Sequence, residues 1–151
     1  MKKVYSLWAV LVLSSTAIAQ VTDMGGPLGW KKKLPQKDVP VETMPGYDQN
    51  QIDAEDAIND QQKDVVWRFG YKYQVNYTLN NSGVWTNLPN GDRVWQLGLE
   101  CPDALTMNLL LENVHIPQGA YLYLYDLDQT NRVGAYTSRN NNAEKMLGTE
   151  L

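Results

Sequence analysis

Polar and apolar side chains alternate from residue 65 onward. One face carries Phe69, Tyr71, Tyr73, Val75, Tyr77 and Leu79, and the other carries Arg68, Lys72, Gln74, Asn76 and Thr78. Successive side chains of a strand point to opposite faces of its sheet, so this period of two predicts an antiparallel strand with one buried face.

The stretch 93–125 contains three further apolar segments, each of strand length, and the remainder of the chain is expected to pack around it. The segments span residues 93–100, 105–116 and 121–125. A Cys-Pro-Asp turn and a Pro-Gln-Gly turn separate them. Leu105, Met107, Leu109 and Leu111 define the inward face of the middle segment. Leu110 interrupts its alternation, which predicts that this strand is covered on both sides.

Short turns divide the remaining strand candidates. Residues 80–83 form one turn, and a strand is predicted at 84–88. The following Pro89-Asn90-Gly91-Asp92 contains an Asn-Gly pair, a strong signal for a hairpin. Another short strand is predicted at 133–137. These closely spaced turns predict a mainly β fold, an antiparallel β-sandwich or jelly-roll-like domain with one short N-terminal helix.

The predicted helix lies within residues 48–64. Asp48 is the expected N-cap, with Gln51 as its capping-box partner. Ile52, Ala54, Ala57 and Ile58 form a narrow apolar stripe, which predicts a short surface helix. The carboxylates of Asp53, Glu55 and Asp56 lack the spacing of a calcium loop, so we interpret them as a solvated helix face.

The first nineteen residues have the three parts of a secretory signal peptide. Lys2 and Lys3 precede an apolar run at 7–13, and Ala17-Ile18-Ala19 matches a cleavage site. Cleavage is therefore predicted between Ala19 and Gln20. The apolar run is too short to span a bilayer. We expect a secreted protein, extracellular or periplasmic, without stable membrane insertion after cleavage.

Three regions are predicted after the signal peptide 1–19. Residues 20–47 are expected to be an irregular leader, because Pro27, Pro35, Pro40 and Pro45 interrupt them. Residues 48–64 form the short helix and a linker. Residues 65–151 form the β-domain, which is expected to be C-terminally incomplete because residues 146–151 resemble the approach to another strand.

Charge and composition narrow the class of partner. The chain carries 13 basic and 17 acidic residues, for a formal net charge of −4. Removal of the signal peptide takes away Lys2 and Lys3 and makes the chain more acidic. An acidic chain without a basic stripe argues against nucleic acid as a partner. Nine Tyr and five Trp against one Phe suit half-buried sheet faces and binding surfaces.

The sequence predicts no reaction centre. Its single cysteine, Cys101, is expected to be a buried structural thiol, or to pair with a cysteine outside these residues. No feature of the sequence links Cys101 to the single histidine, His115, which is expected to be an ordinary strand-end residue. We therefore predict no catalytic residue, no cofactor and no metal ion within these 151 residues.

Several short motifs, in order along residues 45–142, resemble one known family. They are Ala54-Glu55-Asp56, Trp67-Arg68-Phe69-Gly70, Asn81-Ser82-Gly83-Val84-Trp85, Leu88-Pro89-Asn90-Gly91-Asp92-Arg93-Val94-Trp95, Pro117-Gln118-Gly119-Ala120-Tyr121-Leu122-Tyr123 and Gly134-Ala135-Tyr136-Thr137-Ser138-Arg139-Asn140-Asn141. The chain resembles the N-terminal pro-region of secreted bacterial serine endopeptidases of the lysyl-endopeptidase type, which are trypsin-like.

The resemblance implies a precursor in which a signal peptide and a β-rich pro-region precede a trypsin-like catalytic domain. That domain would carry a Ser-His-Asp triad and cleave after Lys, and no Gly-Asp-Ser-Gly run occurs in this chain. The implied role of the present residues is to assist folding or maintain latency of the catalytic domain, their partner. Candidate processing points are Arg68, Lys72 and the run 31–33.

The tyrosines of residues 121–125 are a candidate partner surface. Tyr121, Tyr123 and Tyr125 share one face and could pack on the catalytic domain with their hydroxyls at the rim. Alternatively, they cover the outer face of the sheet, or they pack inward while the leucines between them face another layer.

The sequence is also compatible with two other functions. One is a carbohydrate-binding or adhesin-type β-sandwich module, in which Trp30, Trp85, Trp95 and the three tyrosines would stack on sugar rings. It requires aromatic rings that are exposed and coplanar on one face. The other is a structural accessory domain of a larger secreted protein.

Overall fold

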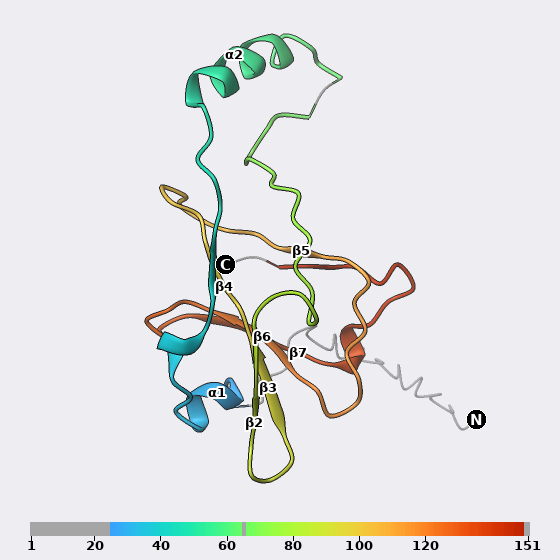
Figure 1. Cartoon of the computed structure of the whole chain (residues 1–151). Coiled ribbons are helices and arrows are strands. Elements are labelled where there is room, and N and C mark those ends of the chain that lie inside the picture. The colour runs from blue at the N-terminus through green and yellow to red at the C-terminus, as the bar shows by residue number, and fades with distance from the viewer. Residues whose placement is uncertain (1–24, 65, 150–151) are drawn as a thin grey trace, which may run out of the picture.

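The computed structural model describes residues 25–64 and 66–149 (Figure 1). The signal peptide and its cleavage site at Ala19 and Gln20 lie outside the described residues. The described residues form two α-helices, α1 (Leu28–Lys31) and α2 (Gln49–Asn59), and two 3-10 turns, η1 (Gln36–Asp38) and η2 (Ser138–Asn140). The strands are β1 (Val41–Thr43), β2 (Val84–Asn87), β3 (Arg93–Gln96), β4 (Gly98–Glu100), β5 (Leu110–Leu111), β6 (Leu122–Tyr125), β7 (Arg132–Tyr136) and β8 (Leu147–Gly148).

The predicted β-sandwich or jelly-roll-like fold is wrong for this structure. The described strands form four separate two-stranded sheets, paired β1-β4, β2-β3, β5-β8 and β6-β7. A sandwich needs two larger sheets packed face to face. Such sheets do not form here because the described residues of two predicted strands, 66–79 and 105–116, make little or no strand pairing.

The hairpin β2–β3 confirms the prediction from the Asn-Gly pair. Its strands are antiparallel, with Trp85 opposite Trp95. Gly91 in the connecting turn has a φ of 89°, in the left-handed region that glycine enters at little cost. The backbone N–H of Leu88 donates to the Asp92 carbonyl at 2.8 Å and closes the turn.

Among the described residues, an apolar core cluster forms around the hairpin β6–β7. Ile116, Leu124 and Tyr136 are its buried members. The half-buried residues packed against them are Leu109, Val114, Ala120, Leu122, Val133 and Leu147. The leucine face of β6 therefore points into the core, and the tyrosines of the same strand lie on the other face.

The strands β5 and β8 pair with each other next to the core cluster. Leu111 lies opposite Leu147, and the N–H of Thr149 donates to the Leu109 carbonyl at 2.9 Å. The Thr149 hydroxyl accepts from the Leu109 N–H at 3.2 Å. This mutual pairing extends the short sheet by one residue and buries Thr149, which is 4% exposed.

The expected leader contributes regular structure. Strand β1 pairs in parallel with β4, with Val41 opposite Gly98. A Cβ at Gly98 would lie 2.8 Å from the Val41 side chain, so the close approach requires glycine there. Helix α1 is docked through Trp30, whose ring meets that of Tyr125 edge-on with centroids 5.0 Å apart. Residues 25–47 thus form part of the fold.

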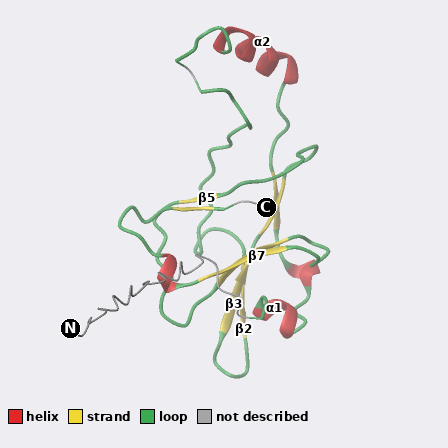
Figure 2. Ribbon diagram, turned by 180° about the vertical axis from the view of Figure 1, so that it is seen from behind, coloured by secondary structure: helices red, strands yellow, loops and turns green. Residues whose placement is uncertain are grey.

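Helix α2 confirms the predicted helix and its cap. The Asp48 carboxylate accepts from the backbone N–H groups of Asn50 and Gln51. The predicted capping box is wrong, because the Gln51 side chain donates to Glu55 at 2.9 Å. Seen from either side, α2 stands at the end of the molecule away from the sheets (Figure 2).

The predicted strand 105–116 is reduced to β5. Leu105, expected inward, is fully exposed, and Leu110, expected to be covered, is also exposed. Asp103 and Asn113 adopt positive φ values of 62° and 55° and bend the backbone on either side. The bend at Asn113 falls inside the predicted segment, and only Leu110 and Leu111 form a strand there, opposite Gly148 and Leu147 of β8.

Candidate functional site

Residues 66–79, here called the open segment, form the most prominent uncovered feature of the described chain. The segment connects α2 to β2 and includes most of the strongest apolar alternation in the sequence (Figure 1). It is not part of any sheet. The backbone groups of residues 66–75 make no hydrogen bond to any other described residue. The alternating pattern that predicted a strand is therefore present in the sequence, but in the structure these residues pair with no strand.

The apolar face of the open segment is exposed. Phe69 is 93% exposed and Trp67 is 74% exposed. The other exposed apolar residues of the segment are Val66, Tyr71, Val75 and Leu79. Contiguous apolar exposure on a soluble chain marks a surface that meets another molecule or another part of the protein. We therefore take this face as the candidate functional site.

The N-terminal end of the segment is held to α2 by ion pairs. The Arg68 guanidinium contacts the Glu55 carboxylate at 2.6 Å and the Asp56 carboxylate at 2.9 Å. The hydrogen bond between Arg68 and Glu55 lowers the pKa of the Glu55 carboxyl and raises the pKa of the Arg68 guanidinium. The acidic face of α2 was predicted to be simply solvated, but part of it positions this end of the segment.

Tyrosines hold the middle of the segment. Tyr71 stacks on Tyr47, with centroids 5.7 Å apart and planes inclined by 22°. The Tyr73 hydroxyl donates to the Pro45 carbonyl at 2.6 Å. Loss of solvation raises the pKa of Tyr73, and the nearby Cys101 thiol contributes to the rise. The ring stacking and the hydrogen bond both go to residues before α2, and the Cys101 thiol lies near the Tyr73 hydroxyl.

The C-terminal end is fixed by the hairpin β2–β3. The indole N–H of Trp85 donates to the Leu79 carbonyl at 3.0 Å. The indole N–H of Trp95 donates to the Ser82 carbonyl at 2.9 Å. A Cβ at Gly83 would lie 2.6 Å from the Trp95 ring, so glycine lets the turn approach the indole. The open segment is thus anchored at both ends while its apolar face stays uncovered.

An open groove of about 590 Å³ joins this face to the core. It is lined by Phe69, Asn108, Val133, Tyr136, Gly148 and Thr149. Phe69 comes from the open segment, Tyr136 from β7 and Gly148 from β8. The groove therefore connects an unpaired extended backbone with the outermost part of the β5–β8 sheet.

The three candidate tyrosines of β6 have different surroundings. Tyr121 is 51% exposed, whereas Tyr123 and Tyr125 are half-buried. The Tyr125 hydroxyl accepts a hydrogen bond from Gln96 Nε2 at 2.9 Å, and its ring packs on Trp30. Within the described structure, Tyr125 thus belongs to an internal contact, and Tyr121 is the most exposed of the three.

The aromatic residues considered for sugar stacking do not form a platform. The Arg93 guanidinium lies over the Trp85 ring, 4.4 Å from its centroid. Trp95 is half-buried under the turn at Ser82, and Trp30 meets Tyr125 edge-on. The stacked pair among the described rings is Tyr47 with Tyr71, which the sequence did not single out.

The polar candidates lie apart from the groove lining. Cys101 is half-buried with a free thiol, and His115 is exposed. Asp53, from the acidic cluster of α2, accepts a hydrogen bond from Gln49 at 2.6 Å. Within residues 25–64 and 66–149 there is no group of three or more His, Cys, Asp or Glu side chains placed to hold a metal ion.

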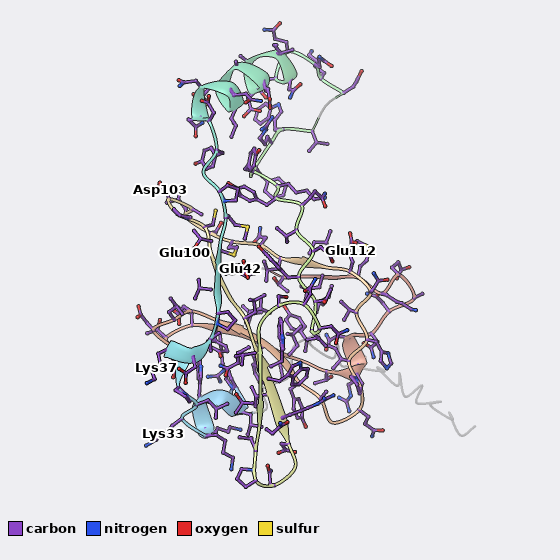
Figure 3. All side chains as sticks on the ribbon, viewed as in Figure 1. Lys33, Lys37, Glu42, Glu100, Asp103 and Glu112 are labelled. Atoms are coloured by element: carbon purple, nitrogen blue, oxygen red, sulfur yellow. The ribbon has the colours of Figure 1, made fainter. Side chains whose placement is uncertain are left out.

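The basic leader is accessible. Lys31, Lys32 and Lys33 are exposed at the end of α1, and Figure 3 shows Lys33 next to α1 and Lys37 on η1. No helix in the described part of the chain is long and apolar enough to cross a bilayer.

Comparisons with models of protein families, with curated proteins and with solved structures find no match to this chain. The resemblance to the pro-regions of lysyl-endopeptidase-type enzymes therefore remains a prediction from the motifs.

Sequence reasoning missed the polar residues that organise the loops. Asp126 accepts from the Thr130 hydroxyl at 2.6 Å and from the Asn131 amide at 2.9 Å. Hydrogen bonds from Thr130 and Asn131 lower the pKa of Asp126 from 3.8 to about 2. The spacing Asp-x-x-x-Thr-Asn after an apolar strand is the signal that indicates such a side-chain-closed turn.

Proposed function

We propose that this chain is the non-catalytic N-terminal pro-region of a secreted bacterial serine endopeptidase precursor. It assists the folding or maintains the latency of a trypsin-like catalytic domain, which follows it in the precursor and cleaves after Lys. The signal peptide pattern at 1–19 supports export, and the ordered motifs along residues 45–142 support the family.

One structural observation carries the proposal that the chain acts by binding another polypeptide. The open segment is anchored at Arg68 and at Leu79, yet most of its apolar face and the backbone of residues 66–75 are uncovered. A strand-like segment in this state binds other strands readily, because its unpaired N–H and C=O groups and its apolar side chains both gain by pairing. The motif that begins at Trp67 lies within this segment.

The experiment is refolding in trans. The denatured catalytic domain of the precursor is refolded with and without residues 20–151, and hydrolysis of a lysyl peptide substrate is followed. An assisting chain raises the yield of active enzyme, and a latency chain lowers the activity of the folded enzyme in proportion to its concentration. An unchanged yield together with unchanged activity would contradict the proposal.

A matched pair of variants tests the role of the open segment in the same assay. Phe69→Asp places a charge on the exposed apolar face and should weaken either effect. Leu127→Asp makes the same kind of change at a residue that is 73% exposed in the β6–β7 loop, away from the segment. It should behave as the unmodified chain does. Equal behaviour of the two variants would exclude the open segment as the binding element.

A further inference from the structure

The backbone of residues 66–75 is accessible to an endopeptidase. Such an enzyme binds several consecutive residues of its substrate in extended form, through hydrogen bonds to their backbone N–H and C=O groups. A backbone that is already hydrogen-bonded must open before it can be cut. Within the described parts of the chain, residues 66–75 make no backbone hydrogen bond. This stretch therefore meets the backbone requirement for cleavage without prior opening.

Lys72 lies inside this stretch, between residues 69–71 and 73–75. Its side chain is exposed and forms no ion pair among the described residues. One neighbour, Tyr71, stacks on Tyr47. The other neighbour, Tyr73, donates one hydrogen bond to the Pro45 carbonyl. A single side-chain contact opens more readily than a paired strand or a helix, so Lys72 is a basic side chain on an accessible backbone.

The lysines of the leader are exposed, but their backbone is folded. The N–H groups of Lys32 and Lys33 donate to the carbonyls of Leu28 and Trp30, at 2.9 and 3.0 Å. Lys37 lies in η1. Cleavage at these lysines therefore requires local unfolding first, although their side chains are accessible.

Lys63 follows α2 closely and keeps helical turns on its N-terminal side. The N–H groups of Gln61 and Gln62 donate to the carbonyls of Ile58 and Asn59, at 3.3 and 2.9 Å. An endopeptidase that cuts after Lys63 must extend these two residues. Lys63 is exposed like Lys72 and differs from it in this pairing of the backbone.

Arg68 has an open backbone but an occupied side chain. Its guanidinium contacts Glu55 at 2.6 Å and Asp56 at 2.9 Å, and it must leave both carboxylates to enter a specificity pocket. The other basic residues of the described chain lie in β3, β7, η2 and a hydrogen-bonded turn, and they are Arg93, Arg132, Arg139 and Lys145. Lys72 thus combines an open backbone with an unpaired basic side chain.

We propose that the Lys72–Tyr73 peptide bond is a processing site for an endopeptidase whose acidic specificity pocket takes lysine. Water adds across this bond: the C–N bond breaks, a C–O bond forms, Lys72 gains a carboxylate and Tyr73 gains an amino group. The inference goes beyond the proposed function and does not depend on it, because any endopeptidase of this specificity can make the cut.

The two fragments stay together after the cut. The chain passes from α2 to β2 through the open segment, so the N-terminal fragment contains α1 and β1 and the C-terminal fragment contains β4 and β6 (Figure 1). Strand β1 pairs with β4, and the Gly98 N–H donates to the Pro40 carbonyl at 2.8 Å. The rings of Trp30 and Tyr125 pack edge-on across the same boundary. Cleavage therefore produces a two-fragment form of the fold.

Brief digestion of the full 151-residue chain with trypsin, followed by mass spectrometry, tests the position of the cut. Trypsin accepts every lysine and arginine, so the folded chain decides which site is used first. Among residues 25–149, we expect cleavage after Lys72 to be at least about tenfold faster than after any other basic residue, because the other sites must open first. A first cut elsewhere in this range overturns the inference.

Matched variants test the role of the backbone. Lys72→Gln should remove the first cut, and Lys63→Gln should leave it unchanged. In the Lys72→Gln chain, Gln74→Lys places a lysine on the open segment and should restore rapid cleavage. Ala57→Lys places one at an exposed position of α2 and should not. Equal cleavage of the last two variants contradicts the inference, because the paired backbone of α2 would then give no protection.

Size-exclusion chromatography of the cut chain tests the two-fragment form. The fragments that end at Lys72 and begin at Tyr73 should elute together in buffer, at the volume of the uncut chain, and separately in urea. Separate elution in buffer overturns the two-fragment form.

Discussion

The side-chain amide of Asn141 pairs with both backbone groups of Ile116. The Ile116 N–H donates to Asn141 Oδ1 at 2.9 Å, and Asn141 Nδ2 donates to the Ile116 carbonyl at 2.9 Å. Ile116 is a buried member of the core cluster, 7% exposed. The Asn141 amide thus takes the place of a neighbouring strand at Ile116 and satisfies both backbone groups of this residue at the edge of the core.

Asn141→Ala should destabilise the fold by about 1–3 kcal/mol, because it leaves the N–H and the carbonyl of Ile116 without their partner. Asn141→Asp keeps an acceptor for the Ile116 N–H and loses the donor to the Ile116 carbonyl. Its change in the free energy of unfolding should therefore differ from that of Asn141→Ala. Urea unfolding followed by tryptophan fluorescence measures both. Equal stability of the Ala variant and the unmodified chain would show that water replaces the side chain at no cost.

Gly83→Ala should be more damaging than Gly91→Ala. Both glycines have positive φ, 71° and 89°, so both variants carry about 1–2 kcal/mol of backbone strain. The new methyl group at position 83 would also lie 2.6 Å from the Trp95 ring and 2.7 Å from the Gln96 carbonyl, whereas position 91 is open. We expect a total of about 2–5 kcal/mol at position 83. Thermal unfolding of the two variants measures the loss of stability in each. Equal losses would contradict the close contact between Gly83 and the Trp95 ring.

The loop closed by Asp126 should make the free energy of unfolding depend on pH in the acidic range. The pKa of Asp126 is lowered from 3.8 to about 2 in the fold, so its ionised form stabilises the folded state. That contribution is complete above pH 3.8 and is lost as the pH falls towards 2. Unfolding by urea between pH 5 and pH 2 should show this loss in the unmodified chain.

Asp126→Asn removes the titrating group and should reduce the pH dependence in this window. Asp128→Asn is the matched control in the same loop, at an exposed residue, and should keep the dependence of the unmodified chain. An Asp126→Asn variant with the full pH dependence would contradict the role assigned to this carboxylate.

Arg68→Gln should loosen the connection between α2 and the open segment. The ion pairs to Glu55 and Asp56 lie near the surface, so salt should screen them. Amide exchange in residues 49–59 should therefore rise in the variant at low salt, and the difference should shrink in high salt. Lys72→Gln removes a positive charge from the same segment and should leave this exchange unchanged. A similar rise in both variants would assign the effect to net charge alone.

Local signals in the sequence predicted local structure well. The Asn-Gly turn predicted β2–β3, and Asp48 predicted the start of α2. In both cases the decisive contacts lie within a few residues of each other, so they depend little on the remainder of the chain.

The arrangement of strands was not predicted, because pairing depends on residues far apart in the sequence. The alternation of residues 65–79 specifies which face is apolar, but it does not supply a partner, and the segment remains uncovered in this chain. The strand predicted at 105–116 was wrong for a more local reason, since Asn113 turns the backbone inside this segment, shortly after β5. The docking of the leader through β1 and Trp30 likewise depends on distant partners, Gly98 and Tyr125.

The candidate site was found only in part. The sequence drew attention to the tyrosines at 121–125, whereas the exposed apolar surface of the structure lies mainly on residues 66–79. The pattern of that segment was recognised, but it was interpreted as half-buried, because alternation alone does not show whether a partner is present.

If this chain is a pro-region acting on a trypsin-like domain, its removal should change lysyl peptidase activity. The measurement compares this activity in the purified precursor before and after proteolytic removal of residues 20–151, and in a precursor expressed without these residues. We expect low activity in the intact precursor and a rise on removal, or a poor yield of active enzyme from the shortened precursor. Equal specific activity and equal folding yield in all three preparations, or no lysyl peptidase activity in any of them, would contradict it.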